Sequence, residues 1–327
     1  MRGKSRLRSA GPVLFISGLM LVFAGGASAG TFEVDRFDSD LPDVQVGDGV
    51  CETEGGGCTF RAALQEAGET AGTDTVVLEA GSQTTLTIPG QPNNSFPSIW
   101  VPAGVTIKSS GPGRATISGG CVCPLLGYDR GTGLIEDINF DGGYLAILVS
   151  GAELTVNRSR FANLNNNGSS SSAIHVNSSA GAGVIVNDSI IENSRASYYG
   201  VTMVSTGSIT FNRSLIRNNT STAYTTATIS TYSFSNSSAT IRIYNSTLQN
   251  NRSNAWGAVN STIGTLDIRH STFIDNDGAP AVRISPRCRP GQRDDPRVDN
   301  PARCQRRLRL RGRQWRSGRF QHRERDR

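Results

Sequence analysis

The sequence predicts an all-β protein, a right-handed parallel β-helix with a short N-terminal capping helix, and three observations support this fold class. An eleven-residue pattern recurs, as in ITFNRSLIRNN from Ile209 and VIVNDSIIENS from Val184. Apolar and polar residues alternate within the copies, which is typical of β-strands. β-Branched residues and Asn dominate the copies, whereas good helix formers are scarce, and this argues against helical repeats.

The spacing of the repeats indicates a stack of coils. The central serines of the copies are Ser159, Ser189, Ser214, Ser246 and Ser271, at intervals of 30, 25, 32 and 25 residues. Self-similarity at this period is typical of a solenoid. Each copy predicts two short strands with a bend at the Asn-Arg or Asn-Asp pair before the serine, since Asn tolerates a left-handed backbone. A third strand is expected in the spacers, at residues 173–176, 201–204, 227–230 and 258–261.

Two columns of asparagine side chains are expected to stack between coils, because stacked amides hydrogen-bond along the axis of such a fold. The first column holds Asn157, Asn187 and Asn212, and the second holds Asn163, Asn193, Asn218 and Asn250. We expect Asn218 to be buried in a turn. The repeats resemble those of polymorphic outer-membrane proteins and of the pectate-lyase-like superfamily, which implies a protein of the cell surface or the extracellular space.

Residues 1–29 are predicted to be a secretory signal peptide. A basic start is followed by an apolar run at residues 13–23 and by the small residues Ala27, Ser28 and Ala29. No other stretch is long enough to cross a membrane as a helix. The chain is therefore expected to be secreted or displayed at the outer cell surface, and not to be an integral membrane protein.

Residues 30–100 are expected to form an N-terminal cap and the first coil. The stretch CTFRAALQEA resembles the core of the CSLREA domain, which is found in exported bacterial β-helix proteins. The matching residues are Cys51, Cys58, Thr59, Arg61, Ala63, Ala67, Gly72, Asp74, Thr75 and Leu78, whereas Phe60 and Ala62 depart from the pattern. Phe60, Ala63, Leu64 and Ala67 would share one face of a helix that covers the first coil.

The cysteines are expected to serve structure. Cys51 and Cys58 flank a glycine-rich loop, and in an exported protein a disulfide is favoured over a metal site. Cys121 and Cys123 are too close in sequence for an easy mutual bridge. Their role is left open between free thiols and a pair that pins a loop, and no metal site is predicted.

The regular repeats are expected over residues 101–282, and they offer few candidates for catalysis. The acidic candidates are Asp137 and Asp141 in one coil and Asp188 in another, and no two acidic groups are expected at the same position of adjacent coils. Asp188 would lie between Arg158 and Arg213 in the stack, as a surface ion ladder or as a site for an anionic sugar. We favour the ladder. His175 should point outward from its strand and is a weak catalytic signal by itself.

Aromatic residues cluster in the spacers between the repeats, where a solenoid commonly binds ligands. The candidates for stacking on sugars are Tyr198, Tyr199, Tyr224 and Trp256. Tyr232 and Phe234 also lie in spacers, and the alternative is that about half of these rings fill the preceding strand.

Charge is distributed unevenly along the chain. Residues 30–282 hold 13 Lys and Arg against 22 Asp and Glu, whereas residues 283–327 hold 16 Arg against five acids. The acidic body argues against specific nucleic-acid binding. The tail has three interpretations: a basic arm, a segment linked through Cys288 and Cys304, or a frameshifted or truncated end. We favour the last, because the repeats stop in mid-coil and we expect no alternation beyond residue 284.

These observations predict a non-catalytic, adhesin-like or glycan-binding protein that needs no cofactor. The alternative is a polysaccharide lyase or glycoside hydrolase that uses Asp188 or the Asp137 and Asp141 pair, with Ca²⁺ as a cofactor only in that case. The expected partner is a polysaccharide or a cell-surface glycan. Self-association is also expected through an uncapped last coil at residues 266–273.

Overall fold

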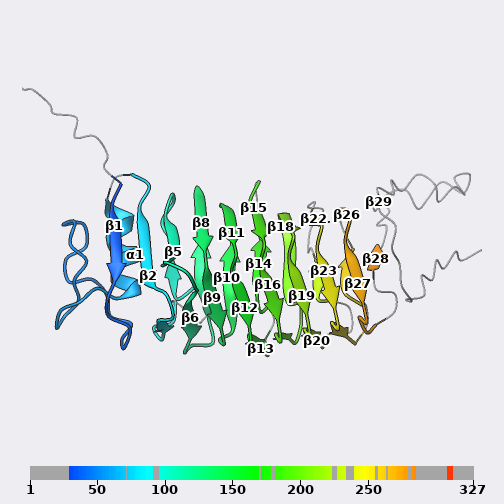
Figure 1. The fold of residues 1–327 in the computed structure, drawn as a ribbon, viewed down its shortest axis with the longest axis horizontal. Coiled ribbons are helices and arrows are strands. Elements are labelled where there is room, and N and C mark those ends of the chain that lie inside the picture. Colours follow the sequence, from blue (N-terminus) through cyan, green and yellow to red (C-terminus); the bar gives the residue numbers. More distant parts are fainter. Residues whose placement is uncertain are drawn as a thin grey trace, which may run out of the picture.

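A computed structural model shows an elongated solenoid in which parallel strands stack along one axis (Figure 1). The predicted fold class, an all-β parallel β-helix, is confirmed. The structure describes residues 29–70, 72–90, 96–168, 171–177, 181–222, 227–232, 239–254, 257–262, 264–278, 282–284 and 308–311. The signal-peptide prediction for residues 1–29 therefore falls outside the described residues, apart from Ala29.

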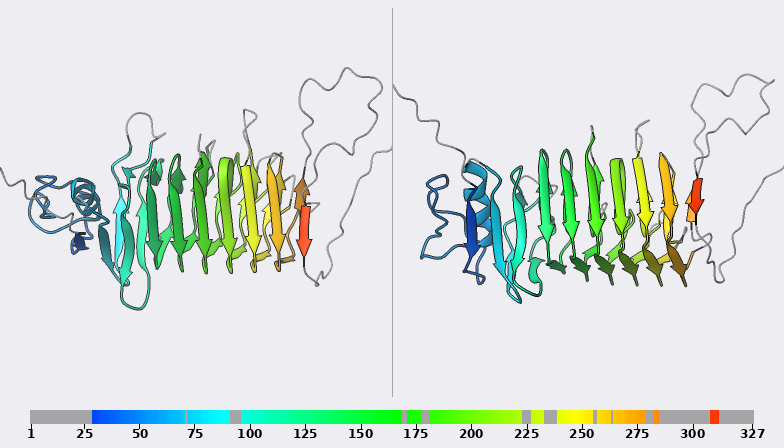
Figure 2. Two further views of the ribbon diagram at one scale, coloured as in Figure 1. Left: turned by 90° about the horizontal axis from the view of Figure 1, so that it is seen from above. Right: turned by 45° about the horizontal axis from the view of Figure 1, so that its top comes forward.

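The longest sheet, called sheet 1 here, runs the length of the solenoid, and its strands lie side by side in both views of Figure 2. In each strand the buried residues alternate with outward-facing ones, as in β11 and β15. Sheet 1 consists of β1 (Thr31–Val34), β2 (Thr75–Glu79), β5 (Thr106–Ser110), β8 (Thr132–Glu136), β11 (Glu153–Asn157), β15 (Gly183–Asn187), the second part of β18 (Thr202–Asn212), β22 (Ala239–Tyr244), β26 (Thr265–Arg269) and β29 (Leu308–Arg311).

Sheet 2 follows sheet 1 after a tight bend in each coil, as the repeats predicted. It consists of β3 (Gln83–Leu86), β6 (Ala115–Gly119), β9 (Ile138–Asp141), β12 (Arg160–Ala162), β16 (Ile190–Glu192), β19 (Leu215–Arg217), β23 (Thr247–Gln249) and β27 (Thr272–Ile274). A two-residue strand follows in four coils and was not predicted. This sheet 3 consists of β13 (Asn165–Asn166), β17 (Arg195–Ala196), β20 (Thr220–Ser221) and β24 (Arg252–Ser253).

Sheet 4 is built from the spacers and confirms the additional strand predicted there. It consists of β4 (Ile99–Trp100), β7 (Pro124–Tyr128), β10 (Leu145–Val149), β14 (Ile174–Asn177), the first part of β18, β21 (Ile229–Thr231), β25 (Val259–Ser261) and β28 (Val282–Ile284). Gly207, at a φ of 96° where only glycine is unstrained, lies between the two parts of β18. A coil therefore passes through as many as four sheets instead of three.

The bends differ from the prediction by one residue. The left-handed residue between sheets 1 and 2 is the one directly before the serine, such as Arg158 at a φ of 48° and Asp188 at 52°, and not the preceding asparagine. A second left-handed bend joins sheets 2 and 3. It holds Asn163, Asn193, Asn218 and Asn250, all at positive φ and all exposed.

The first asparagine column forms the expected ladder. Asn187 and Asn212 each donate a side-chain hydrogen bond of 3.0 Å to the asparagine of the preceding coil, and Asn157 donates to Glu136. The second predicted column is wrong, because its members occupy the exposed bend. The buried ladder is one residue later: Asn219 Nδ2 donates to Asn251 Oδ1 over 3.0 Å, and Asn251 Nδ2 donates to Asn276 Oδ1 over 2.9 Å.

The repeat serines form another ladder inside the bend. The backbone N–H of Ser159 donates to the hydroxyl of Ser189 in the next coil, and Ser189 does the same to Ser214. Each of these hydroxyls donates in turn to the carbonyl oxygen two residues earlier. Serine recurs at this position because its hydroxyl satisfies two backbone groups that the bend removes from the sheets.

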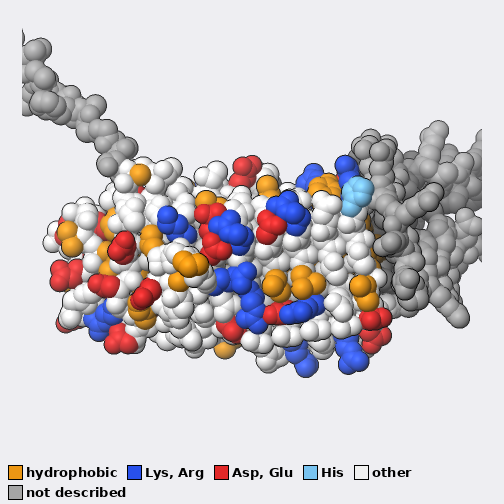
Figure 3. Space-filling view, in the orientation of Figure 1, with side chains coloured by type: hydrophobic (Ala, Val, Ile, Leu, Met, Phe, Trp, Pro, Cys, Tyr) orange, Lys and Arg blue, Asp and Glu red, His pale blue; other side chains and the backbone are white. Residues whose placement is uncertain are grey.

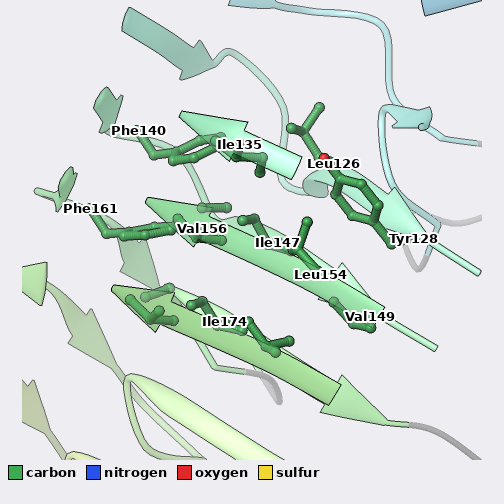
Figure 4. Close-up of a cluster of buried hydrophobic side chains, with 14 of the residues drawn as sticks. Leu126, Tyr128, Ile135, Phe140, Ile147, Val149, Leu154, Val156, Phe161 and Ile174 are labelled. Atoms are coloured by element: carbon green, nitrogen blue, oxygen red, sulfur yellow. The ribbon is translucent and has the colours of Figure 1, made fainter. Parts of the chain in front are cut away.

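The core is a column of apolar side chains that stack on equivalent residues of neighbouring coils (Figure 4). Phe140 and Phe161 stack with ring centroids 4.9 Å apart. Val156 and Ile135 pair in register on sheet 1, as Ile147 and Ile174 do on sheet 4. The repeat therefore encodes continuous burial along the axis, with each coil covering the next.

The predicted capping helix is α1 (Phe60–Glu69), at the N-terminal end of the stack (Figure 2). Thr59 caps it by accepting the N–H of Ala62, and the predicted apolar face is buried. Arg61 is also buried, and it forms a bidentate ion pair with Asp40 at 2.8 and 3.0 Å. The same carboxylate accepts the backbone N–H groups of Thr87 and Ile88, so the pair ties the cap to the first coil.

The described part of the chain contains two disulfides. Cys51 and Cys58 are joined as predicted, with their Cα atoms 5.2 Å apart. Cys121 and Cys123 are also joined, with a Cα separation of 5.3 Å, so the expectation that they are too close to pair is wrong. A bend at residues 121–123 brings their side chains to the same side of the chain.

The C-terminal prediction holds only in part. Residues 282–284 form β28 on β25, which confirms the strand expected to open a further coil. Residues 308–311 form β29 on β26, so Leu-Arg-Leu-Arg is an alternating segment and the expectation that nothing alternates beyond residue 284 is wrong. The uncapped edge expected for residues 266–273 is therefore wrong for β26, which β29 covers, whereas no described strand pairs with the far edge of β27. Cys288, Cys304 and the question of the reading frame lie outside the described residues.

Candidate functional site

The acidic candidates lie in a column of alternating charge at the bend between sheets 1 and 2. The column runs through Asp137, Arg158, Asp188 and Arg213 in successive coils. Arg158 Nη2 lies 2.8 Å from Asp137, and Arg213 Nη2 lies 2.7 Å from Asp188. In the face seen in Figure 3, Arg and Lys side chains accordingly lie next to Asp and Glu over the central coils.

Asp137 and Asp188 occupy the same position of coils that are not adjacent, which agrees with the expectation that no two acidic groups share a position in adjacent coils. Arg158 separates them, so they form no carboxylate pair. Hydrogen bonds from Arg213 hold the pKa of Asp188 below its ordinary value, against the smaller effect of burial. A carboxyl group with a lowered pKa is a poor proton donor near neutral pH. The ladder interpretation therefore fits the geometry better than a general acid.

A second ion cluster lies on the outer side of sheet 2. Glu192 is buried between Arg160 and Arg217, whose Nε atoms lie 2.6 and 2.7 Å from its two carboxylate oxygens. Burial by itself would raise the pKa of Glu192, but the hydrogen bonds and charges of Arg217 and Arg160 bring it below the ordinary value. Asp141 joins the cluster, 3.6 Å from Arg160 and bonded to Asn163.

The acidic residues thus act as partners for arginine. In the described part of the chain, no three His, Cys, Asp or Glu side chains converge as metal ligands would.

Three tyrosines from neighbouring coils do converge. Tyr198 and Tyr199 follow β17, and Tyr232 follows β21. The ring of Tyr199 contacts the edge of Tyr198, with centroids 4.7 Å apart, and contacts Tyr232 at 4.9 Å. Tyr199 is buried, whereas Tyr198 is 52% exposed. The other two aromatic candidates, Tyr224 and Trp256, lie outside the described residues.

The tyrosine cluster, defined as Tyr198, Tyr199 and Tyr232, offers an apolar surface with phenolic hydroxyls. Burial raises the pKa of Tyr199, with a further contribution from the neighbouring tyrosines. The hydroxyl of Tyr199 therefore stays protonated at neutral pH, when it can both donate and accept hydrogen bonds. Rings of this kind suit the faces and hydroxyl groups of sugars.

His175 lies on the outward side of β14, as predicted, but it is half-buried. Its Nε2 atom lies 3.4 Å from the hydroxyl of Ser205 in the next coil. Burial lowers the pKa of His175 to about 4, so the imidazole is neutral at neutral pH. A neutral imidazole beside a hydroxyl serves as a polar contact on this face.

Two exposed aromatic residues, Phe96 and Trp100, were not singled out from the sequence. Trp100 in β4 is 37% exposed and pairs in register with Gly127 of β7. The indole lies so close to Gly127 that a Cβ atom there would come within 2.5 Å of it. The sequence feature that could have identified this site is a glycine paired with a tryptophan on the neighbouring strand. The first coils are irregular, so the strand register that pairs the two residues could not be derived from the sequence.

No protein-family model matches the sequence, and no characterised protein matches it significantly. Among the described residues, no helix has the length and hydrophobicity needed to span a membrane. The argument for function therefore depends on the geometry of the site alone.

Proposed function

We propose that this chain is an exported, non-catalytic glycan-binding protein that contacts its ligand through the tyrosine cluster. The observation that carries the proposal is the contact among Tyr198, Tyr199 and Tyr232, which joins rings from neighbouring coils into one partly exposed surface. The pairing of Asp137 and Asp188 with arginine favours binding over acid catalysis. The two disulfides are compatible with an extracellular protein.

We also infer that residues 30–100 act as a cap of the CSLREA type. Arg61, Ala63 and Ala67, which carry the resemblance, are buried in the helix that covers the first strands. Asp74, another matching residue, accepts the backbone N–H of Gly30 and the hydroxyl of Thr70. The residues of the motif thus have a structural role in this chain, and the ligand-binding role is assigned to the solenoid.

The proposed function is tested by measuring how the purified mature chain binds a panel of soluble polysaccharides, by affinity electrophoresis and titration calorimetry. Tyr198→Ala should weaken binding about threefold to tenfold, because aromatic stacking contributes roughly 0.5–1.5 kcal/mol. Tyr244→Ala is the matched control, since Tyr244 is a partly exposed tyrosine on sheet 1, where its hydroxyl bonds to Asp267.

An affinity that is the same for the wild type and Tyr198→Ala would overturn the proposal. New reducing ends or unsaturated products from any polysaccharide, lost in Asp188→Ala, would favour the lyase or hydrolase alternative instead.

A further inference from the structure

One column of residues points toward the outer side of sheet 4, where Trp100 is exposed, Leu148 and His175 are half-buried, and Gly127, Met203 and Ser230 are buried. Strand register aligns Trp100 of β4, Gly127 of β7, Leu148 of β10, His175 of β14, Met203 of β18 and Ser230 of β21. The tyrosine cluster belongs to the coils of β18 and β21, at the far end of this column from Trp100. The column therefore has an aromatic group at each end.

Trp100 is held as a platform. Gly127 leaves the space that its indole and the ring of Pro97 occupy, because a Cβ atom would come within 2.5 Å of the indole and 2.3 Å of Pro97. The segment just before β4 is also held by the capping helix, because Arg61 donates hydrogen bonds to the carbonyl and hydroxyl oxygens of Ser98.

The column carries no charged side chain from Trp100 to Ser230. The nearest charges after β7, Asp129 and Arg130, pair with each other at 3.1 Å. The outer sides of sheets 1 and 2 differ, because they carry the arginine and carboxylate clusters described above. An anionic polymer would find no cation along this column, whereas an uncharged polymer would lose no ion hydration by binding there.

The length of the column sets the size of the ligand. β4 and β18 are separated by four strand-to-strand steps, and neighbouring strands lie about 4.8 Å apart, which gives roughly 19 Å along the axis. A ligand that contacts both aromatic ends must be an extended chain of several sugar rings. A monosaccharide or disaccharide could reach only one end.

We propose that the outer side of sheet 4, from Trp100 to the tyrosine cluster, binds an extended, uncharged polysaccharide that lies along the solenoid axis. This inference rests on the proposed function and deepens it by naming the ligand class and its second contact. Sugar rings would stack on the indole at one end and on Tyr198 at the other, with the half-buried His175 as a polar contact between them.

The test measures the affinity of the mature chain for short and long oligosaccharides of a neutral β-1,4-glucan and of polygalacturonate. The neutral series should bind more tightly as its length increases to span the column, and polygalacturonate should bind more weakly. Trp100→Ala should weaken binding of the long neutral chain about threefold to tenfold. Trp100→Phe should restore most of it, because it restores a ring.

Gly127→Ala is a second variant, and it keeps every side chain that is proposed to contact the ligand. It should weaken long-chain binding by displacing the indole, and melting curves of each variant verify that it is folded. If Tyr198→Ala weakens binding but folded Trp100→Ala and Gly127→Ala do not, the proposed function stands and this inference is wrong. Affinity that is independent of length, or tighter binding of polygalacturonate, would overturn the inference alone. Absence of binding by every glycan would overturn both.

Discussion

At the scale of single residues, two adjacent positions of the repeat have opposite roles. Asn218 lies in the left-handed bend at a φ of 55° and is exposed, whereas Asn219 is fully buried. Asn219 donates to the carbonyl of Ile191 and accepts the N–H of Ser194. Both are asparagine for different physical reasons, since Asn218 tolerates positive φ and Asn219 replaces hydrogen bonds that the bend breaks.

Asn219→Leu should lower the free energy of unfolding by about 1–3 kcal/mol, because it leaves backbone groups of the neighbouring coil unpaired. Asn218→Gly is the matched control and should change stability by less than about 1 kcal/mol, because glycine adopts positive φ without strain. Urea unfolding followed by circular dichroism measures both. A larger loss in the Asn218 variant than in the Asn219 variant would show that the ladder assignment is incorrect.

At the scale of elements, sheet 2 is held together by charges that cross three coils. Glu192 on β16 connects Arg160 on β12 with Arg217 on β19. The carboxylate is buried and the two arginines are partly exposed. We therefore expect the cluster to contribute more to stability than a surface ion pair does, while its desolvation cost is smaller than that of a fully buried pair. The folded-state pKa of Glu192 is lowered from the ordinary value of 4.5.

Glu192→Gln should lower the free energy of unfolding at neutral pH by about 1–3 kcal/mol, because two arginines lose their carboxylate. A lowered folded pKa means that the stabilisation is present above the unfolded pKa and is lost as the pH falls through the folded pKa. The difference in stability between wild type and variant should therefore shrink below pH 4.5.

Urea unfolding at a series of pH values measures this difference. Glu153→Gln, at an exposed position of sheet 1, is the control and should show no comparable pH-dependent difference. A difference between wild type and Glu192→Gln that stays constant down to acid pH would contradict the assigned role of the carboxylate.

At the scale of the whole molecule, the solenoid depends on its N-terminal cap, because each coil contacts only its neighbours and the first coil has one open end. The cap is tied down by the ion pair of Arg61 with Asp40, whose side chains are 9% and 2% exposed. The pair is fully hydrogen-bonded, since Asp40 also accepts two backbone N–H groups and Arg61 donates to Ser98.

Asp40→Ala should destabilise the protein by about 3–5 kcal/mol, because it leaves the buried guanidinium without its partner. Dye binding to exposed apolar surface should increase before global melting, since the cap separates from the first coil. Asp38→Ala is the control, because Asp38 pairs with Arg36 at the surface, and its melting temperature should not change. Unchanged melting and dye binding in Asp40→Ala would mean that the cap is not needed.

The sequence by itself determined the features that repeat. The period of the serines, the alternation of apolar residues and the spacer strands were sufficient to predict stacked parallel strands, because a coil must bury the same positions as its neighbours. The apolar face of α1 and the pairing of Cys51 with Cys58 were also predictable, since both depend on residues close together in the chain.

The tertiary structure alone decided the contacts between coils. The intervals between repeat serines vary from 25 to 32 residues, so the sequence does not reveal which residues meet along the axis. For this reason the sequence pattern wrongly placed Asn218 instead of Asn219 inside, and it did not bring Trp100 to Gly127. It anticipated Asp188 between Arg158 and Arg213, but it did not reveal that Asp137 pairs with Arg158. A shift of one residue in the strand register turns every inward-facing side chain outward, and only the hydrogen-bonded register of the strands removes that ambiguity.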